Sequence, residues 1–225
     1  MARSKQSRGK CAFCGREMTG GGFVRHLAAC SARQEAIEKA NQGPGSKQTL
    51  YHLYIKDEWN SDFWLHLEMN GEAQLEALDR YLRAIWLECC GHLSQFGDWH
   101  EDETPMHRRA NQVFEPGVEL MHIYDFGTES RTLIRVVDER QGKPLTKHPI
   151  KLMARNDMPE YECTECNQTA KWWCPECVYE HDESGLLCDE HAAAHPHDDY
   201  GGVMPLVNSP RVGMCGYDGP AEPPY

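Results

Sequence analysis

The sequence lacks any run of about 18 apolar residues, the length that a membrane-spanning helix needs. No apolar stretch follows its polar first ten residues, so a secretory signal is not expected. Phosphate-binding loops, nucleophile elbows, dinucleotide fingerprints and kinase signatures are missing as well. These absences favour a cytoplasmic protein without membrane contact, and they remove the commonest motif-based grounds for predicting an enzyme.

The net charge of the chain is divided unevenly, with an excess of positive charge in residues 1–33 alone. Residues 1–33 hold seven basic residues and one acidic residue, Glu17, so this segment carries +6. Because the whole chain carries −12, the remaining residues carry −18. The seven basic residues are Arg3, Lys5, Arg8, Lys10, Arg16, Arg25 and Arg33. Since basic segments attract phosphates and acidic ones repel them, we expect any nucleic acid to bind through residues 3–33. A protein partner is the alternative.

Cysteine, in contrast, is abundant, with 11 residues among 225. In a chain without an export signal, thiols stay reduced and bind metal more often than they form disulfides. Two parts of the chain carry cysteine and histidine at the spacing of zinc ligands, so metal is the expected cofactor.

The first of these parts reads Cys11-x2-Cys14-x11-His26-x3-Cys30. A two-residue gap lets Cys11 and Cys14 reach one ion from a tight turn, and His26 and Cys30 share one face of a helix. Such a small unit has little apolar area, so metal binding would supply its folding free energy. The alternative is an unstructured basic tail with incidental cysteines.

The second part, residues 163–197, holds five cysteines and four histidines. Its ligand pairs are Cys163-x2-Cys166, Cys174-x2-Cys177, Cys188-x2-His191 and His195-x-His197. Four half-sites predict two zinc ions, and the alternative is one ion beside solvated histidines. With the N-terminal motif, twelve ligands therefore predict three zinc ions. Four protein ligands around each ion would make all three sites structural rather than catalytic.

This C-terminal arrangement resembles a B-box-type zinc module, in which alternate ligand pairs share an ion. The resemblance implies one ion held by Cys163, Cys166, Cys188 and His191, and a second held by Cys174, Cys177, His195 and His197. His181 could replace one of the two last histidines. Cys215, in the Pro- and Gly-rich tail, has no partner by spacing and could also replace an assigned ligand.

Composition divides the chain into three parts. Residues 1–42 hold the basic arm and the finger, 46–155 hold the only substantial apolar core, and 156–225 hold the second Cys/His module and the tail. The segment Gln42-Gly43-Pro44-Gly45-Ser46 forms a linker, because glycine and proline break helix and strand.

Within the central part, apolar spacings of three and four predict one helix over Glu72–Cys90. Alternating residues predict strands at Leu50–Ile55, Phe63–Met69, Val118–Phe126, Arg131–Glu139 and Ile150–Ala154. We therefore predict an α+β fold, with a central mixed or antiparallel sheet and one long amphipathic helix, flanked by two small zinc-stabilised modules.

Four motifs of the central part carry a family resemblance: Phe63-Trp64, Leu75-x-x-Leu78-Asp79, His92-Leu93-x-x-Phe96 and Tyr124-Asp125-Phe126-Gly127. By these motifs, residues 48–155 resemble the plasmid pRiA4b ORF-three-like family. The family commonly continues with Asp and an aromatic residue after that glycine, whereas this chain has Thr128-Glu129-Ser130-Arg131. Its members occur on plasmids and mobile elements and have no established biochemical role, so the resemblance implies a fold rather than an activity.

These observations favour a zinc-binding, non-enzymatic adaptor or regulatory protein that binds nucleic acid or protein. The alternative is an enzyme of unknown reaction with its site near His92 and Asp125, because a His–Asp pair can exchange protons or hold a metal. A simpler role for Asp125 is to bind the backbone amides of a turn over Asp125–Gly127, with Tyr124 in the core.

Overall fold

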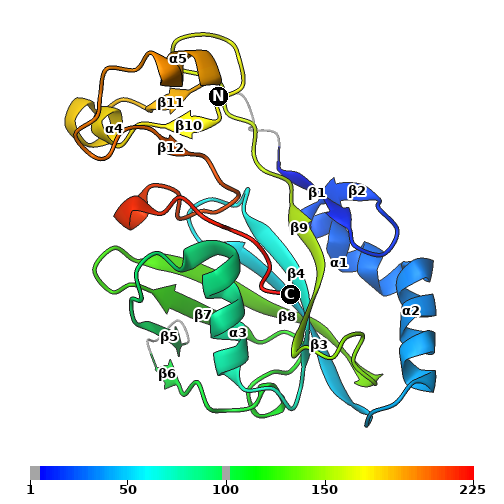
Figure 1. The fold of residues 1–225 in the computed structure, drawn as a ribbon. Helices are drawn as coiled ribbons and strands as arrows, with labels where there is room; N and C mark the ends of the chain where they lie inside the picture. The colour runs from blue at the N-terminus through cyan, green and yellow to red at the C-terminus, as the bar shows by residue number, and fades with distance from the viewer. Residues whose placement is uncertain (1–5, 98–101) are drawn as a thin grey trace.

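The computed structural model describes residues 6–97 and 102–225 (Figure 1). Arg3 and Lys5 of the predicted basic segment lie outside the described residues. The strands are β1 (Arg8–Cys11), β2 (Glu17–Thr19), β3 (Gln48–Asp57), β4 (Trp64–Asn70), β5 (Ser94–Gly97), β6 (Glu103–Thr104), β7 (Glu119–Tyr124), β8 (Ser130–Gly142), β9 (Ile150–Asn156), β10 (Trp172–Trp173), β11 (Leu186–Leu187) and β12 (Met204–Pro205). The α-helices are α1 (Gly20–Ala29), α2 (Ser31–Gln42), α3 (Leu75–Leu82), α4 (Pro175–His181) and α5 (Asp189–Ala193). A π-helical turn spans Arg83–Leu87, and 3-10 turns span Ala110–Gln112 and Met214–Gly216.

Nine strands form one sheet in the order β2-β1-β9-β4-β3-β8-β7-β5-β6. Every neighbouring pair in this sheet is antiparallel. The five predicted strands are present as β3, β4, β7, β8 and β9, with ends shifted by a few residues. The other four strands extend the sheet at its two edges, and they are too short to show a clear alternation in the sequence.

The prediction of one long amphipathic helix is wrong. In its place, α3 has eight residues and is followed by the π-helical turn over Arg83–Leu87. The start is late because residues before α3 bond to another loop: Gln74 forms a β-bridge with Arg109, and Leu75 N donates to Arg108 O at 2.9 Å. These hydrogen bonds take the backbone groups that an earlier helical turn would use.

The end of this segment also departs from the prediction. Glu88 N donates to Arg83 O, five residues earlier, at 2.8 Å, and Glu88 itself is extended. The π-helical turn shifts the helical register and the chain leaves the helix before Cys89. The periodic apolar pattern of Glu72–Cys90 is therefore longer than the regular α-helix, which spans only Leu75–Leu82.

The prediction that two separate modules flank the sheet also needs correction, because the N-terminal one is part of the sheet. Strand β1 pairs with β9, with Gly9 opposite Asn156, so the N-terminal Cys/His segment continues the large sheet. A β-ladder provides this link, which motif spacing cannot reveal. The second Cys/His segment has a sheet of its own, in the order β11-β10-β12, and lies above the large sheet in Figure 1.

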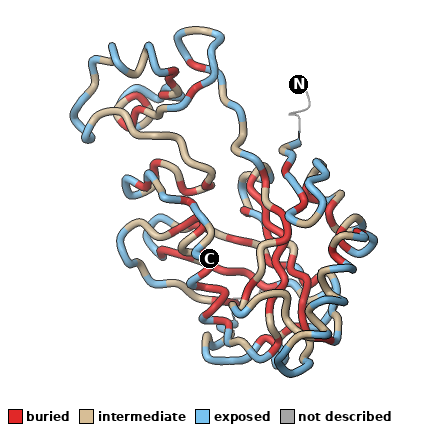
Figure 2. Tube along the Cα trace, turned by 45° about the vertical axis from the view of Figure 1, so that its right-hand side comes forward, coloured by how far each residue is buried: buried red, intermediate tan, exposed pale blue. Residues whose placement is uncertain are grey.

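Strand β4 is buried on both faces, and Figure 2 shows the buried segments running through the body of the sheet. The β4 side chains that belong to the main core with α3 are Leu65, Leu67 and Met69. On the opposite face, Trp64 packs with Phe23 of α1 in a second cluster. His66 and Glu68 share the face of Trp64 because side chains alternate along a strand. These two polar groups are buried and need partners.

Glu68 finds its partners in two arginines. Its Oε1 lies 2.6 Å from Arg140 Nη2 on β8, and its Oε2 lies 3.2 Å from Arg33 Nη2 on α2. Arg33 is itself buried, so this ion pair holds α2 against the sheet. Removing Glu68 would leave the buried Arg33 without its ion-pair partner, which costs about 3–5 kcal/mol.

His66 and His52 form a buried hydrogen-bonded chain. Gly20 O can only accept, so His66 Nε2 donates to it at 2.9 Å, and His66 Nδ1 accepts from His52 Nε2 at 2.8 Å. Because Nδ1 of His66 accepts, this chain requires a neutral His66 ring. Burial disfavours the charged form of both rings, and it lowers the pKa of His52 to about 2 and that of His66 to about 4.

We expect the free energy of unfolding to fall as the pH drops below about 6.5, because both histidines then bind a proton in the unfolded chain but not in the fold. Each should contribute on the order of 1–2 kcal/mol between pH 7 and pH 5. Urea denaturation at these two pH values measures the difference.

The exposed His107 provides the matched control. His52→Gln and His66→Gln should each reduce the pH dependence, whereas His107→Gln should leave it as in the wild type. The same pH dependence in all four proteins would contradict the assignment. Loss of metal at low pH is common to the four proteins and does not affect the comparison.

Among the residues that the structure describes, no helix is both long enough and apolar enough to cross a membrane.

Candidate metal centres

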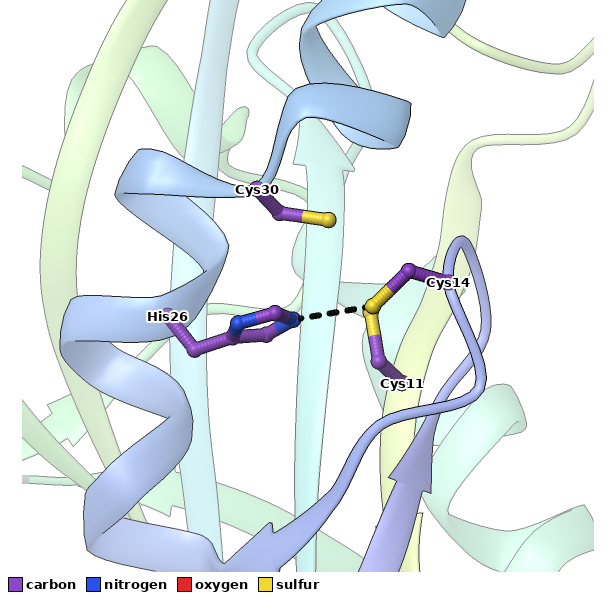
Figure 3. A group of neighbouring side chains, drawn as sticks. All are labelled: Cys11, Cys14, His26 and Cys30. Carbon is purple, nitrogen blue, oxygen red and sulfur yellow. Dashed lines mark hydrogen bonds between the residues drawn. The ribbon is translucent and has the colours of Figure 1, made fainter.

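The N-terminal ligands come from a turn and from the helix that faces it (Figure 3). Cys11 ends β1 and Cys14 lies in the following turn, while His26 is on α1 and Cys30 directly follows that helix. Gly15, at φ 71°, closes the turn by donating its N–H to Cys11 O at 2.9 Å. The four ligand atoms lie within 4.8 Å of one another.

This spacing fits one ion. Around a tetrahedral zinc ion, two sulfurs are about 3.8 Å apart, and a sulfur and an imidazole nitrogen about 3.5 Å. Cys14 Sγ lies 3.3 Å from His26 Nε2. The four residues could therefore bind a metal with only small adjustments of their side chains.

The local electrostatics differ among these ligands. A backbone hydrogen bond from Arg16 lowers the pKa of Cys14, whereas burial raises the pKa of Cys11. Burial, followed by the charge of Arg16, lowers the pKa of His26. A neutral imidazole and a thiolate are the forms that bind metal.

The sheet supplies apolar support for this group. Phe23 and Leu27 of α1 are fully buried, and the ring centroid of Phe23 lies 5.4 Å from that of Trp64. The finger therefore packs on β4 rather than standing alone in solvent.

In the C-terminal segment, Cys163, Cys166, Cys188 and His191 form one group. His191 Nδ1 lies 3.5 Å from Cys163 Sγ, 3.6 Å from Cys166 Sγ and 3.3 Å from Cys188 Sγ. Burial alone would raise the pKa of Cys163, but backbone hydrogen bonds, that from Cys188 first, lower it to about 6.

The other group is Cys174, Cys177, His195 and His197. Cys177 Sγ lies 3.3 Å from both His195 Nε2 and His197 Nδ1, and Cys174 Sγ lies 3.7 Å from His197 Nδ1. Burial raises the pKa of Cys177 to about 12. The structure thus brings the first ligand pair together with the third, and the second with the fourth, in the interleaved order that the B-box resemblance implies.

His181 is not a member of either four-residue group. Its ring stacks on His197 with centroids 5.0 Å apart, and its Nε2 lies 3.9 Å from Glu176 Oε1. With Glu176 and His197 it forms a three-residue group, which shares His197 with the larger one.

Several Cys/His groups of the described residues could hold a metal ion, and all eleven cysteines are free of disulfides. One such group was missed by motif spacing: Cys89, Cys90, His92 and Cys215. The adjacent Cys89-Cys90-x-His92 is a signal that could have suggested half of a site. Cys215 has no such signal, because it lies far along the chain.

His92 and Asp125 also meet, with His92 Nε2 3.4 Å from Asp125 Oδ2. Asp125 Oδ1 accepts from the backbone N–H of Gly127 at 3.0 Å and of Thr128 at 3.2 Å, and Tyr124 is fully buried. The hydrogen bonds of the simpler turn interpretation are therefore present. Acid–base chemistry at His92 and Asp125 stays a prediction.

Comparison with known protein families and with curated proteins gives no match. Among solved structures, the chain is similar to a protein of unknown function, MM3350, from Methanosarcina mazei Go1. The sequence identity is 15% and the TM-score is 0.39, over 45% of this chain and 66% of that chain. A similarity of this size assigns no function.

We expect His195→Ala to lower the metal content of the purified protein by one ion, because His195 contributes a ligand atom to the second C-terminal group. His181→Ala is the matched control and should leave the metal content unchanged. Elemental analysis of protein purified without chelator measures both. An ion lost from His181→Ala and retained by His195→Ala would reverse the assignment.

Proposed function

We propose that this chain is a zinc-binding protein without enzyme activity, an adaptor or regulator that uses its metal sites to build binding surfaces. The observation that carries this proposal is that each of the three expected groups offers four ligand atoms to one point. Four protein ligands close a tetrahedral zinc site, whereas catalytic zinc keeps a position for water. Mixed thiolate and imidazole ligands at tetrahedral spacing suit Zn²⁺.

Two further properties extend the proposal. Eleven free thiols suit a reducing compartment, which supports the cytoplasm. The resemblance of residues 48–155 to the plasmid pRiA4b ORF-three-like family supports an association with mobile genetic elements.

If the three ions are structural, chelation should increase hydrogen exchange in residues 11–30 and 163–197 and leave α3 and β3 protected. The reason is that α3 and β3 pack in the main core, which needs none of these ions. Mass-detected hydrogen exchange with and without chelator tests this, and added Zn²⁺ should restore the protection. Simultaneous loss of protection along the whole chain would contradict a separate structural role for the ions.

Nucleic acid is the partner class that the N-terminal surface supports best. Arg16 and Arg25 are exposed and line the same surface hollow as the ligands Cys14 and His26. Their two exposed guanidinium groups could bind phosphates of a nucleic acid.

Two other basic residues of the segment contribute less. Lys10 is exposed but pairs with Glu17, with 3.4 Å between Nζ and Oε1. Arg33 is buried against Glu68 and cannot reach a phosphate. The positive surface is therefore smaller than the charge of residues 1–33 suggests, and the acidic remainder of the chain opposes binding. Weak, salt-sensitive affinity follows.

Fluorescence anisotropy of a labelled DNA duplex, titrated at two salt concentrations, tests the nucleic-acid interface. Arg16→Ala/Arg25→Ala should weaken binding and lower the slope of log K against log [salt] by about 2, because two phosphate contacts are lost. Arg80→Ala/Arg109→Ala removes two exposed arginines elsewhere and should bind as the wild type does.

Equal binding by the Arg16/Arg25 variant and the wild type would place the contact elsewhere. If no protein in the series binds DNA at low salt, a protein partner replaces nucleic acid in the proposal.

A further inference from the structure

A fourth ligand group lies outside the three that the spacing predicts. Its members are Cys89, Cys90, His92 and Cys215, whose ligand atoms lie within 4.8 Å of one another. The first three follow the π-helical turn of the central part, and Cys215 lies in the 3-10 turn of the C-terminal tail. The tail returns to the large sheet, as the red segment of Figure 1 shows.

We propose that these four side chains bind a further thiophilic divalent cation of the Zn²⁺ class, and that this ion fastens the tail to the central part of the chain. Three sulfurs and one imidazole are a common ligand set for tetrahedral zinc. The site would be independent of the three groups on which the proposed function rests.

The distances fit this assignment after a small adjustment. Cys89 Sγ lies 3.4 Å from Cys90 Sγ, and Cys90 Sγ lies 2.9 Å from His92 Nε2. Both are a few tenths of an ångström shorter than the roughly 3.8 and 3.5 Å expected around zinc. Cys90 and Cys215 are exposed, so their side chains have room to move outward.

The buried side chain of Arg211 contacts two of the sulfurs. Arg211 Nη2 lies 3.5 Å from Cys89 Sγ and 3.6 Å from Cys215 Sγ, and its side chain is fully buried. Three thiolates and one divalent cation carry a net charge of −1, to which the ionised Asp125 adds a further negative charge, and the guanidinium of Arg211 offsets one of these two charges. Hydrogen bonds from such outer groups orient metal ligands and tune their charge.

Asp125 lies beside two of the four ligands, with its Oδ2 3.4 Å from His92 Nε2 and 3.6 Å from Cys215 Sγ. Its Oδ2 accepts a 2.6 Å hydrogen bond from Arg211 Nη2, and its Oδ1 binds the turn amides. No disulfide joins the adjacent Cys89 and Cys90, because their sulfurs are 3.4 Å apart and those of a disulfide are about 2.05 Å apart.

The rest of the tail is positioned for this closure. Ser209 Oγ donates to Trp86 O at 2.6 Å, and Arg211 Nη1 donates to Thr128 O at 3.0 Å. Cys215 then adopts a left-handed conformation, with φ 51°, that non-glycine residues rarely populate. An ion on Cys215 would help to offset the cost of this backbone strain.

Metal analysis tests the site. With zinc-supplemented protein purified under reducing conditions and without chelator, the wild type should hold four ions and Cys90→Ser/Cys215→Ser three. Cys14→Ser should also hold three, which shows that the loss of one ion is resolved. Equal metal content in the wild type and the double variant would overturn the proposal, as would a disulfide among Cys89, Cys90 and Cys215.

This result is distinct from failure of the proposed function. Ions lost from Cys14→Ser but not from the double variant would refute only the fourth site, whereas metal-free wild type would refute both. If the double variant does not fold, His92→Gln replaces it in the same measurement, with the same two outcomes.

Limited trypsin digestion gives a readout that depends on the tail. In the wild type, the buried Arg211 should resist cleavage, and in Cys90→Ser/Cys215→Ser the release of residues 212–225 should be several-fold faster. Cys14→Ser should release this peptide at the wild-type rate, because its lost ion lies in the N-terminal group. Equal release from the double variant and the wild type would exclude a fastening role for the ion.

Discussion

The arrangement of this chain depends on one constraint: the buried carboxylate of Glu68 needs partners of opposite charge. Glu68 is buried in the middle of β4, and an isolated charge there would cost several kcal/mol. Arg140 of β8 and Arg33 of α2 supply the opposite charges. This pairing, the β1–β9 ladder and the packing of Phe23 on Trp64 attach the N-terminal segment to the large sheet. The first metal group therefore has a fixed position relative to the central core.

The C-terminal Cys/His segment obeys a different physical rule. Its apolar cluster contains few buried residues, namely Cys174, Cys177 and Leu187. So small a core cannot offset the chain entropy lost on ordering about forty residues. Metal–ligand bonds can supply the missing free energy, which explains why buried ligands take the places that apolar side chains occupy in the main core.

The C-terminal tail leads from the second Cys/His segment back to the main core. Ser209 and Arg211 are buried against the ends of the main-core elements, although the tail shows no hydrophobic periodicity. Arg211 reaches Asp125 of the turn after β7, so a turn-forming aspartate also becomes the anchor of a segment distant in sequence. The cysteines nearest this anchor, Cys89, Cys90 and Cys215, meet because of it.

Local spacing by itself determined much of this protein. Spacing predicted the ligands of the group between Cys11 and Cys30 and the four ligand pairs between Cys163 and His197. It could do so because each half of a site lies within one turn or on one helix face. Alternation likewise located β3, β4, β7, β8 and β9. Only the tertiary structure decided how far the helix after β4 extends, since hydrogen bonds from a loop replace its first turn and a π-helical turn ends it. It also decided that Arg33 is buried and that Cys215 meets Cys89, because contacts between residues distant in sequence leave no period or spacing to read.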